Sequence, residues 1–138
     1  MIRLEGAAAS HVGKVRPVNQ DRALFSQSIA AVADGMGGHA GGEQAATLAI
    51  GELSGVRGVI SLERLMKVAK AANRRIFEQA SGPSLRGMGT TLVAASANPE
   101  RSSLNIVNVG DSRAYRLRGD SFEQLTRDHS LVEDLVAE

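Results

Sequence analysis

Cysteine is absent from the 138-residue sequence, and its absence excludes several kinds of chemistry. The chain can form no disulfide bond, no thiolate metal site and no cysteine nucleophile. A chain without thiols suits a reducing compartment, and we expect it in the cytoplasm. The formal net charge is only +1, so electrostatics give no reason to expect nucleic acid or a membrane surface as a partner. Residues 1–5 begin no long apolar run, so we predict no signal peptide and no membrane segment.

What is present is typical of one globular domain. The composition, 43% hydrophobic and 22% charged residues, is ordinary for such a protein. The chain is long enough to bury a core and short for two cores, so we assign residues 1–138 to one domain. No internal repeat or low-complexity linker divides it.

The apolar pattern predicts two helices among short strands. One helix should begin near Glu43, and a second should be capped by Ser61 and end near Ala80. We expect the small-residue run 28–33 to be buried on both faces. Tight turns between later strands favour antiparallel pairing, hence an α+β fold. Strands are expected at 7–10, 23–25, 28–33, 89–97, 104–109, 114–118 and 122–125.

The last residues resemble the start of a helix without its end. Ser130 and Glu133 form a capping box, and the sequence stops at Glu138. A helix of about two turns at a terminus is marginal by itself. We therefore expect the natural sequence to continue.

The strongest functional signal is the glycine-rich segment 34–43. Asp34 follows an apolar strand, and Gly35 can offer its carbonyl without a side chain in the way. Oxygen ligands of this kind favour hard cations such as Mg²⁺ or Mn²⁺. A flexible turn before a helix is an alternative, and residues 35–40 also match a dinucleotide-binding pattern. We favour metal binding, because Asp34 would place a negative charge beside a pyrophosphate.

Other polar residues could join this site. Asp111 also ends a predicted strand, although the segment 110–113 alone reads as a turn. Arg16 and Asp21 offer a guanidinium for a phosphate and a further carboxylate, or only a surface ion pair. His39 could donate a proton to a leaving group or be a solvated loop residue.

Four residues receive no chemical role. We interpret His11 and His129 as structural. Thr90 and Thr91 fit ordinary strand positions, because β-branched side chains favour strands.

In their order, these segments resemble the PPM family, the PP2C-like metal-dependent serine/threonine protein phosphatases. The glycine-rich form of 34–43 is similar to the bacterial branch. The resemblance implies two packed antiparallel β-sheets flanked by helices, an αββα sandwich that this chain would hold in part, with the active site in a cleft at one end of the sheets. The matching segments cover nearly the whole chain: 16–21, 34–43, 87–91, 110–115 and 125–129.

The resemblance also implies a role for each site residue. Asp34 would bridge two Mn²⁺ or Mg²⁺ ions, and Gly35 would lend its carbonyl to one of them. Asp21 would orient metal-bound water, and Asp111 would belong to a third metal position. Arg16 would hold the substrate phosphate. A metal-bridged hydroxide would then attack the phosphorus of phosphoserine or phosphothreonine, with no covalent intermediate.

Three departures from the family pattern matter. Gln20 stands where many relatives have glutamate, and the spacing before His39 leaves open whether it matches the histidine proposed as general acid in eukaryotic relatives. Nothing after Asp111 supplies the Asp-Gly and Asp-Asn motifs that complete the metal site in the family.

We therefore expect the N-terminal portion of a PPM phosphatase that acts on phosphorylated Ser/Thr proteins, with activity belonging to the complete domain. A non-catalytic phosphoprotein-binding or regulatory module is the alternative. The short chain alone should leave sheet edges and a core face uncovered. Such surfaces favour self-association.

Overall fold

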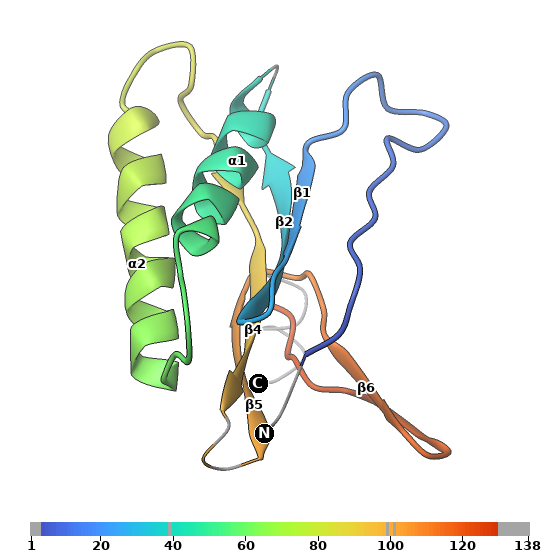
Figure 1. Ribbon diagram of the computed structural model, residues 1–138. Coiled ribbons are helices and arrows are strands. Elements are labelled where there is room, and N and C mark those ends of the chain that lie inside the picture. The colour runs from blue at the N-terminus through green and yellow to red at the C-terminus, as the bar shows by residue number, and fades with distance from the viewer. Residues whose placement is uncertain (1–3, 39, 99, 101, 130–138) are drawn as a thin grey trace, which may run out of the picture.

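The computed structural model describes residues 4–38, 40–98, 100 and 102–129. Figure 1 shows two helices packed beside an antiparallel sheet, with a separate hairpin at the far side of the sheet. The elements in chain order are β1 (Asp21–Phe25), β2 (Ile29–Met36), α1 (Gly41–Ser54), α2 (Leu62–Gln79), β3 (Gly89–Thr90), β4 (Leu92–Asn98), β5 (Ser103–Val109), β6 (Tyr115–Arg118) and β7 (Ser121–Gln124).

The main sheet has the strand order β1-β2-β4-β5, and every pairing is antiparallel. The short strand β3 pairs with the end of β2 and continues the line of β4, because Gly35 pairs with Thr90 and Val32 with Val93 in one register. Strands β6 and β7 form a separate two-stranded sheet. These pairings confirm the predicted α+β class.

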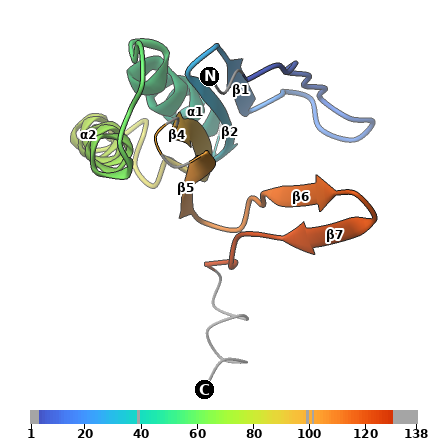
Figure 2. The same ribbon diagram turned by 60° about the horizontal axis from the view of Figure 1, so that its bottom comes forward.

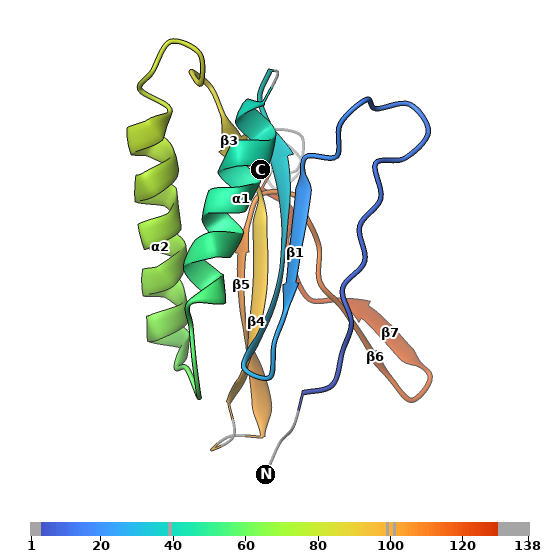
Figure 3. The same cartoon turned by 45° about the horizontal axis from the view of Figure 1, so that its top comes forward.

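The two helices cover one face of the main sheet. Figures 1 and 3 show α1 and α2 on one side, with the N-terminal segment and the β6–β7 hairpin on the other. Figure 2, seen from another direction, keeps the hairpin apart from the helices. The face of the sheet turned away from the helices is called the open face below.

Strand β2 alternates between these two environments. Ile29, Ala31 and Ala33 are buried under the helices, whereas Val32 and Asp34 are exposed on the open face. The expectation that 28–33 is buried on both faces is therefore wrong for this chain. Period-two alternation is typical of an antiparallel strand with one covered face.

The core lies between the helices and the sheet. Leu53 of α1 and Leu65 of α2 are fully buried in one cluster with Ile29. A second cluster is built largely of alanines, and the small side chains of the three from α1, Ala45, Ala46 and Ala49, let that helix lie close to β2. The predicted cap is confirmed, because the Ser61 hydroxyl accepts a hydrogen bond from the Arg64 N–H at 3.2 Å.

Several sequence-based boundaries are wrong. Residues 4–20 contain no helix or strand, so the expected strand at 7–10 does not form. Strand β2 continues beyond Asp34 to Met36, and α1 begins at Gly41 rather than Glu43. The expected strand 89–97 is interrupted at Thr91. The capping box at 130–133 lies outside the described residues.

None of the helices that the structure describes is both long enough and apolar enough to cross a membrane.

Candidate functional site

The pairing of β1 with β2 brings two predicted metal ligands together. Asp21 and Asp34 lie directly opposite each other in the register, at the start of β1 and two residues before the end of β2. Side chains of directly opposed residues share one face of a sheet. Both carboxylates therefore lie on the open face, where they are exposed to solvent.

The electrostatics of Asp34 show that negative charge is concentrated here. Its pKa is raised above the ordinary value by partial burial, then by the charge and hydrogen bonding of the Asp21 carboxyl, and also by the charge of Asp111. The positive charge of Arg16 opposes this rise. Asp21, Asp111 and Arg16 are thus close enough to Asp34 to change its pKa. A divalent cation would relieve the repulsion between these carboxylates.

Gly35 permits an unusually close contact between β2 and α1. A Cβ at this position would lie 2.0 Å from the Gly42 carbonyl oxygen and 2.8 Å from that of Gln20. The Gly35 N–H also donates to the Gln20 carbonyl at 3.2 Å. Packing of backbone on backbone therefore requires glycine here, a reason separate from the carbonyl that it could offer to a metal.

The Gln20 side chain supports the same loop. A Cβ on Gly42 would lie 2.8 Å from its Oε1 atom, and its Nε2 atom lies 3.5 Å from the Gly37 carbonyl oxygen. The Gln20 amide thus packs against the glycine-rich segment and helps to hold it in place.

A pocket of about 220 Å³ joins the predicted phosphate and metal residues. Arg16 lines it together with both opposed aspartates, so the guanidinium and the carboxylates face one space. The full lining is His11, Val12, Arg16, Val18, Asn19, Gln20, Asp21, Asp34 and Gly35.

His11 is a pocket residue that sequence reasoning assigned only a structural role. Its Nδ1 atom accepts a hydrogen bond from the Gly13 N–H at 2.8 Å. That bond orients the imidazole in the loop that carries Arg16. The signal available in the sequence was its position in the same polar loop as Arg16 and Asp21.

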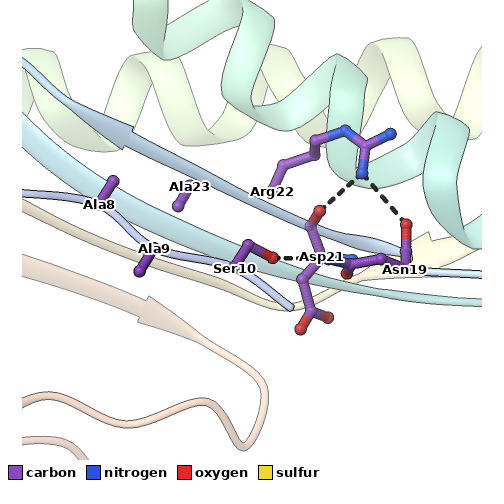
Figure 4. A pocket seen from close by; sticks show the side chains of 7 residues that line it. All are labelled: Ala8, Ala9, Ser10, Asn19, Asp21, Arg22 and Ala23. Atoms are coloured by element: carbon purple, nitrogen blue, oxygen red, sulfur yellow. Dashed lines mark hydrogen bonds between the residues drawn. The ribbon is translucent and has the colours of Figure 1, made fainter. Parts of the chain in front are cut away.

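A second hollow of about 390 Å³ lies beside the start of β1. Figure 4 shows the Asp21 carboxylate directed away from the Arg22 guanidinium, which lies on the helix side. Arg22 donates to the carbonyls of Asn19 at 3.2 Å and Asp21 at 2.7 Å and pairs with Glu43 at 2.5 Å. These contacts fix the strand end from which Asp21 projects.

Asp111 lies on a loop that is anchored from two sides. Gly110 has a φ of +98°, and its packing against Thr91 leaves no room for a side chain. The His129 N–H donates to the Gly110 carbonyl at 2.9 Å, and the His129 Nδ1 atom accepts a hydrogen bond from the Gly110 N–H at 3.3 Å. The Arg113 guanidinium contacts both Asp128 oxygens, with Nε–Oδ1 at 2.9 Å and Nη2–Oδ2 at 2.6 Å.

The described donors fit a hard cation but form only part of its site. Asp21 and Asp34 can offer carboxylate oxygens to such a cation, and Gly35, next to Asp34 in β2, can offer a carbonyl. Within residues 4–38, 40–98, 100 and 102–129, no three His, Asp or Glu side chains are grouped to hold one ion. Because such ions take six or more oxygens, further ligands are required. Asp111 as a ligand stays a prediction, and His39 lies outside the described residues.

Comparison with known proteins agrees with the geometry. The family model described as "Protein phosphatase 2C" matches residues 7–132. The serine/threonine protein phosphatase PstP of Mycobacterium tuberculosis is 41% identical over 140 residues, covering 98% of this chain and 27% of PstP. The serine/threonine phosphatase stp of Listeria innocua is 41% identical over 138 residues, covering 90% of this chain and 54% of the relative.

A solved structure confirms the fold class. The catalytic domain of PstP in complex with two manganese ions superposes with a TM-score of 0.85 at 39% identity, covering 95% of this chain and 58% of that chain. The chain thus spans between about a quarter and three fifths of the length of these relatives. Its fold is that of an antiparallel PP2C domain, present here in part. By the match of the family model over most of its length, the chain belongs to the protein phosphatase 2C family.

Proposed function

We propose that this chain is part of a metal-dependent phosphatase that hydrolyses phosphoserine and phosphothreonine in proteins. The observation that carries the proposal is the pairing of Asp21 with Asp34 in one pocket with Arg16. Carboxylates suit divalent cations, and a guanidinium suits phosphate oxygens. The pocket therefore combines the two kinds of group that phosphate ester hydrolysis requires.

Each residue has a part in this proposal. Asp34, Asp21 and the Gly35 carbonyl would hold Mn²⁺ or Mg²⁺, with Asp111 beside them. When bound, two such cations would lower the pKa of water and neutralise phosphate charge. Arg16 would orient the phosphate through paired hydrogen bonds.

The leaving serine or threonine oxygen needs a proton. His39 remains our sequence-based candidate for the donor. The structure does not describe its side chain. A pH profile of an H39N variant would test this role separately from metal binding.

The deciding experiment compares the full-length protein with Asp34→Asn. Phosphate release from a phosphothreonine peptide would be followed with Mn²⁺ and with EDTA. We expect Asp34→Asn to lose at least about 100-fold in rate, because it removes a charge that the metal requires. Asp120→Asn is a matched control, since Asp120 lies in the β6–β7 turn. Circular dichroism would establish that both variants fold.

Two results would contradict the proposal. Hydrolysis that is unaffected by EDTA would exclude a metal-dependent reaction, and Asp34→Asn activity close to the parent would exclude this role for Asp34. Tight binding of the phosphopeptide without hydrolysis would instead favour the phosphoprotein-binding module.

A further inference from the structure

Thr91 holds Asp34 through an irregular hydrogen-bond pattern. In a hydrogen-bonded pair of an antiparallel ladder, the two opposed residues each donate their backbone N–H to the carbonyl of the other. Here the Thr91 N–H donates to the Asp34 carbonyl at 2.9 Å, as expected. The Asp34 N–H, however, donates to the Thr91 side-chain Oγ1 at 3.0 Å. A hydroxyl thus replaces a backbone carbonyl at the position of the metal-site aspartate.

The carbonyl released by this exchange has its own partner. The Thr90 hydroxyl donates to the Thr91 carbonyl at 2.9 Å. At the interruption between β3 and β4, the Thr91 hydroxyl is therefore the partner of the Asp34 N–H, and the Thr90 hydroxyl is the partner of the Thr91 carbonyl. Such an arrangement is a built feature, because an unpaired backbone group at a buried place is costly.

The same hydroxyl reaches the loop that carries Asp111. Thr91 Oγ1 lies 2.6 Å from Ser112 Oγ, and either oxygen can be the donor. Thr91 is only 7% exposed, so little water competes for these bonds. The Thr91 methyl carbon, Cγ2, also packs on Gly110. A Cβ added to Gly110 would lie only 2.8 Å from that carbon. One side chain thus touches both segments that bring carboxylates to the site.

A role in packing alone does not explain these contacts. Packing uses the methyl group of Thr91, which valine would also supply. The hydroxyl has two partners of its own, the Asp34 backbone and the Ser112 side chain. Groups that orient metal ligands commonly act through such outer hydrogen bonds.

We propose that Thr91, together with Ser112, is a positioning residue that fixes Asp34 relative to the Asp111 loop for metal binding. The inference rests on the proposed function, because it requires Asp34 to bind a divalent cation. Without the hydroxyl, the Asp34 N–H loses its partner, and the strand end must shift to find another. Metal sites tolerate only small displacements of their ligands, on the order of 0.2 Å.

The test is Mn²⁺ binding to the full-length protein, measured by titration calorimetry. Thr91→Val keeps the branched shape and removes the hydroxyl, and we expect its Kd for Mn²⁺ to rise about 10- to 100-fold. Thr91→Ser keeps the hydroxyl and should restore affinity close to that of the parent. Ser112→Ala removes only the second partner and should raise the Kd by a smaller factor.

Thr47→Val is the matched control, because the Thr47 hydroxyl donates to the Glu43 carbonyl within α1, at 2.8 Å. It should leave the Kd unchanged. Melting temperatures of all variants separate loss of fold from loss of ligand geometry. If Thr91→Val lowers the melting temperature and leaves the Mn²⁺ Kd unchanged, the hydroxyl is structural only and the inference is wrong.

Two further comparisons keep the outcome decisive. If Thr91→Val does not fold, Ser112→Ala decides, and a parent-like Kd in that variant overturns the inference. Asp34→Asn in the same titration tests the proposed function independently. Parent-like binding by Asp34→Asn would contradict the proposed function, whereas loss in Asp34→Asn with none in Thr91→Val would contradict only the positioning role.

Discussion

The two faces of the main sheet use the same strands for different purposes. The face under α1 and α2 buries Ile29 and Ala31 against helix residues such as Leu53. The open face carries Asp21 and Asp34 beside small apolar residues. Alternation along each strand places these sets on opposite sides. Substitutions on one face should therefore change stability, and substitutions on the other should change metal binding.

The largest effect should come from the helix-covered face. Leu53 is fully buried, so Leu53→Ala should reduce the free energy of unfolding by about 2–5 kcal/mol through lost burial and a cavity. Urea denaturation of the full-length protein measures this change. At urea concentrations below the unfolding midpoint, the Kd of Leu53→Ala for Mn²⁺ should stay near that of the parent. A large change in Kd in the folded variant would show that the two faces are not independent.

A smaller effect is expected where the two faces meet. Gly35→Ala would place a methyl group against the Gly42 carbonyl, so β2 and α1 must separate. We expect a loss of about 1–3 kcal/mol in stability together with weaker Mn²⁺ binding. Gly51→Ala is the control, because a Cβ there meets nothing within 4 Å. Equal stability in the two variants would contradict the close contact.

Two carboxylates near the start of β1 should differ in their effects on stability and on Mn²⁺ affinity. Glu43→Gln removes a partly exposed ion pair with Arg22 and should cost about 0–1 kcal/mol without changing Mn²⁺ affinity. Asp21→Asn removes a charge from the open face and should weaken Mn²⁺ binding with little loss of stability. Calorimetry and thermal melts of both variants give the two readouts. The same loss of affinity in both would remove the distinction between the faces.

The smallest effect concerns pH. Burial, followed by the nearby Asp21 carboxyl, raises the pKa of Asp34 in the folded protein. Because this pKa is raised, protonated Asp34 contributes stability at pH values below its unfolded pKa of 3.8. That contribution is lost as the pH rises through the pKa of Asp34 in the folded protein. Metal-free Asp34→Asn, which cannot ionise, should therefore melt slightly higher than the parent at neutral pH.

This difference should disappear as the pH falls below 3.8. Thermal melts in EDTA over a pH series would measure it. If Asp34→Asn melted lower than the parent at neutral pH, the ionised form of Asp34 would be stabilised by its surroundings rather than repelled by the nearby carboxylates.

The sequence predicted the fold class, and four of its candidate site residues line one pocket: Arg16, Asp21, Asp34 and Gly35. Apolar periodicity located both helices, and Asp34 followed a strand pattern that the structure confirms as β2. These signals are local, since helix spacing, capping residues and glycine segments act within a few residues of each other.

The parts that sequence reasoning missed depend on contacts between distant residues. The run 7–10 consists of three alanines and a serine, which have little preference for a strand, and it pairs with no other strand. Thr91 read as an ordinary strand residue, yet its hydroxyl contacts Asp34 and Ser112. His11 lines the pocket only because its loop lies over the end of β2.

The anchoring at the base of the β6–β7 hairpin has a consequence for sequence variation. The Leu125 N–H donates to the Ala114 carbonyl at 2.8 Å, and the Arg113–Asp128 pair closes the same end. The turn at 119–120 is remote from these ties. Insertions at that tip can therefore lengthen the hairpin while Asp111 keeps its place.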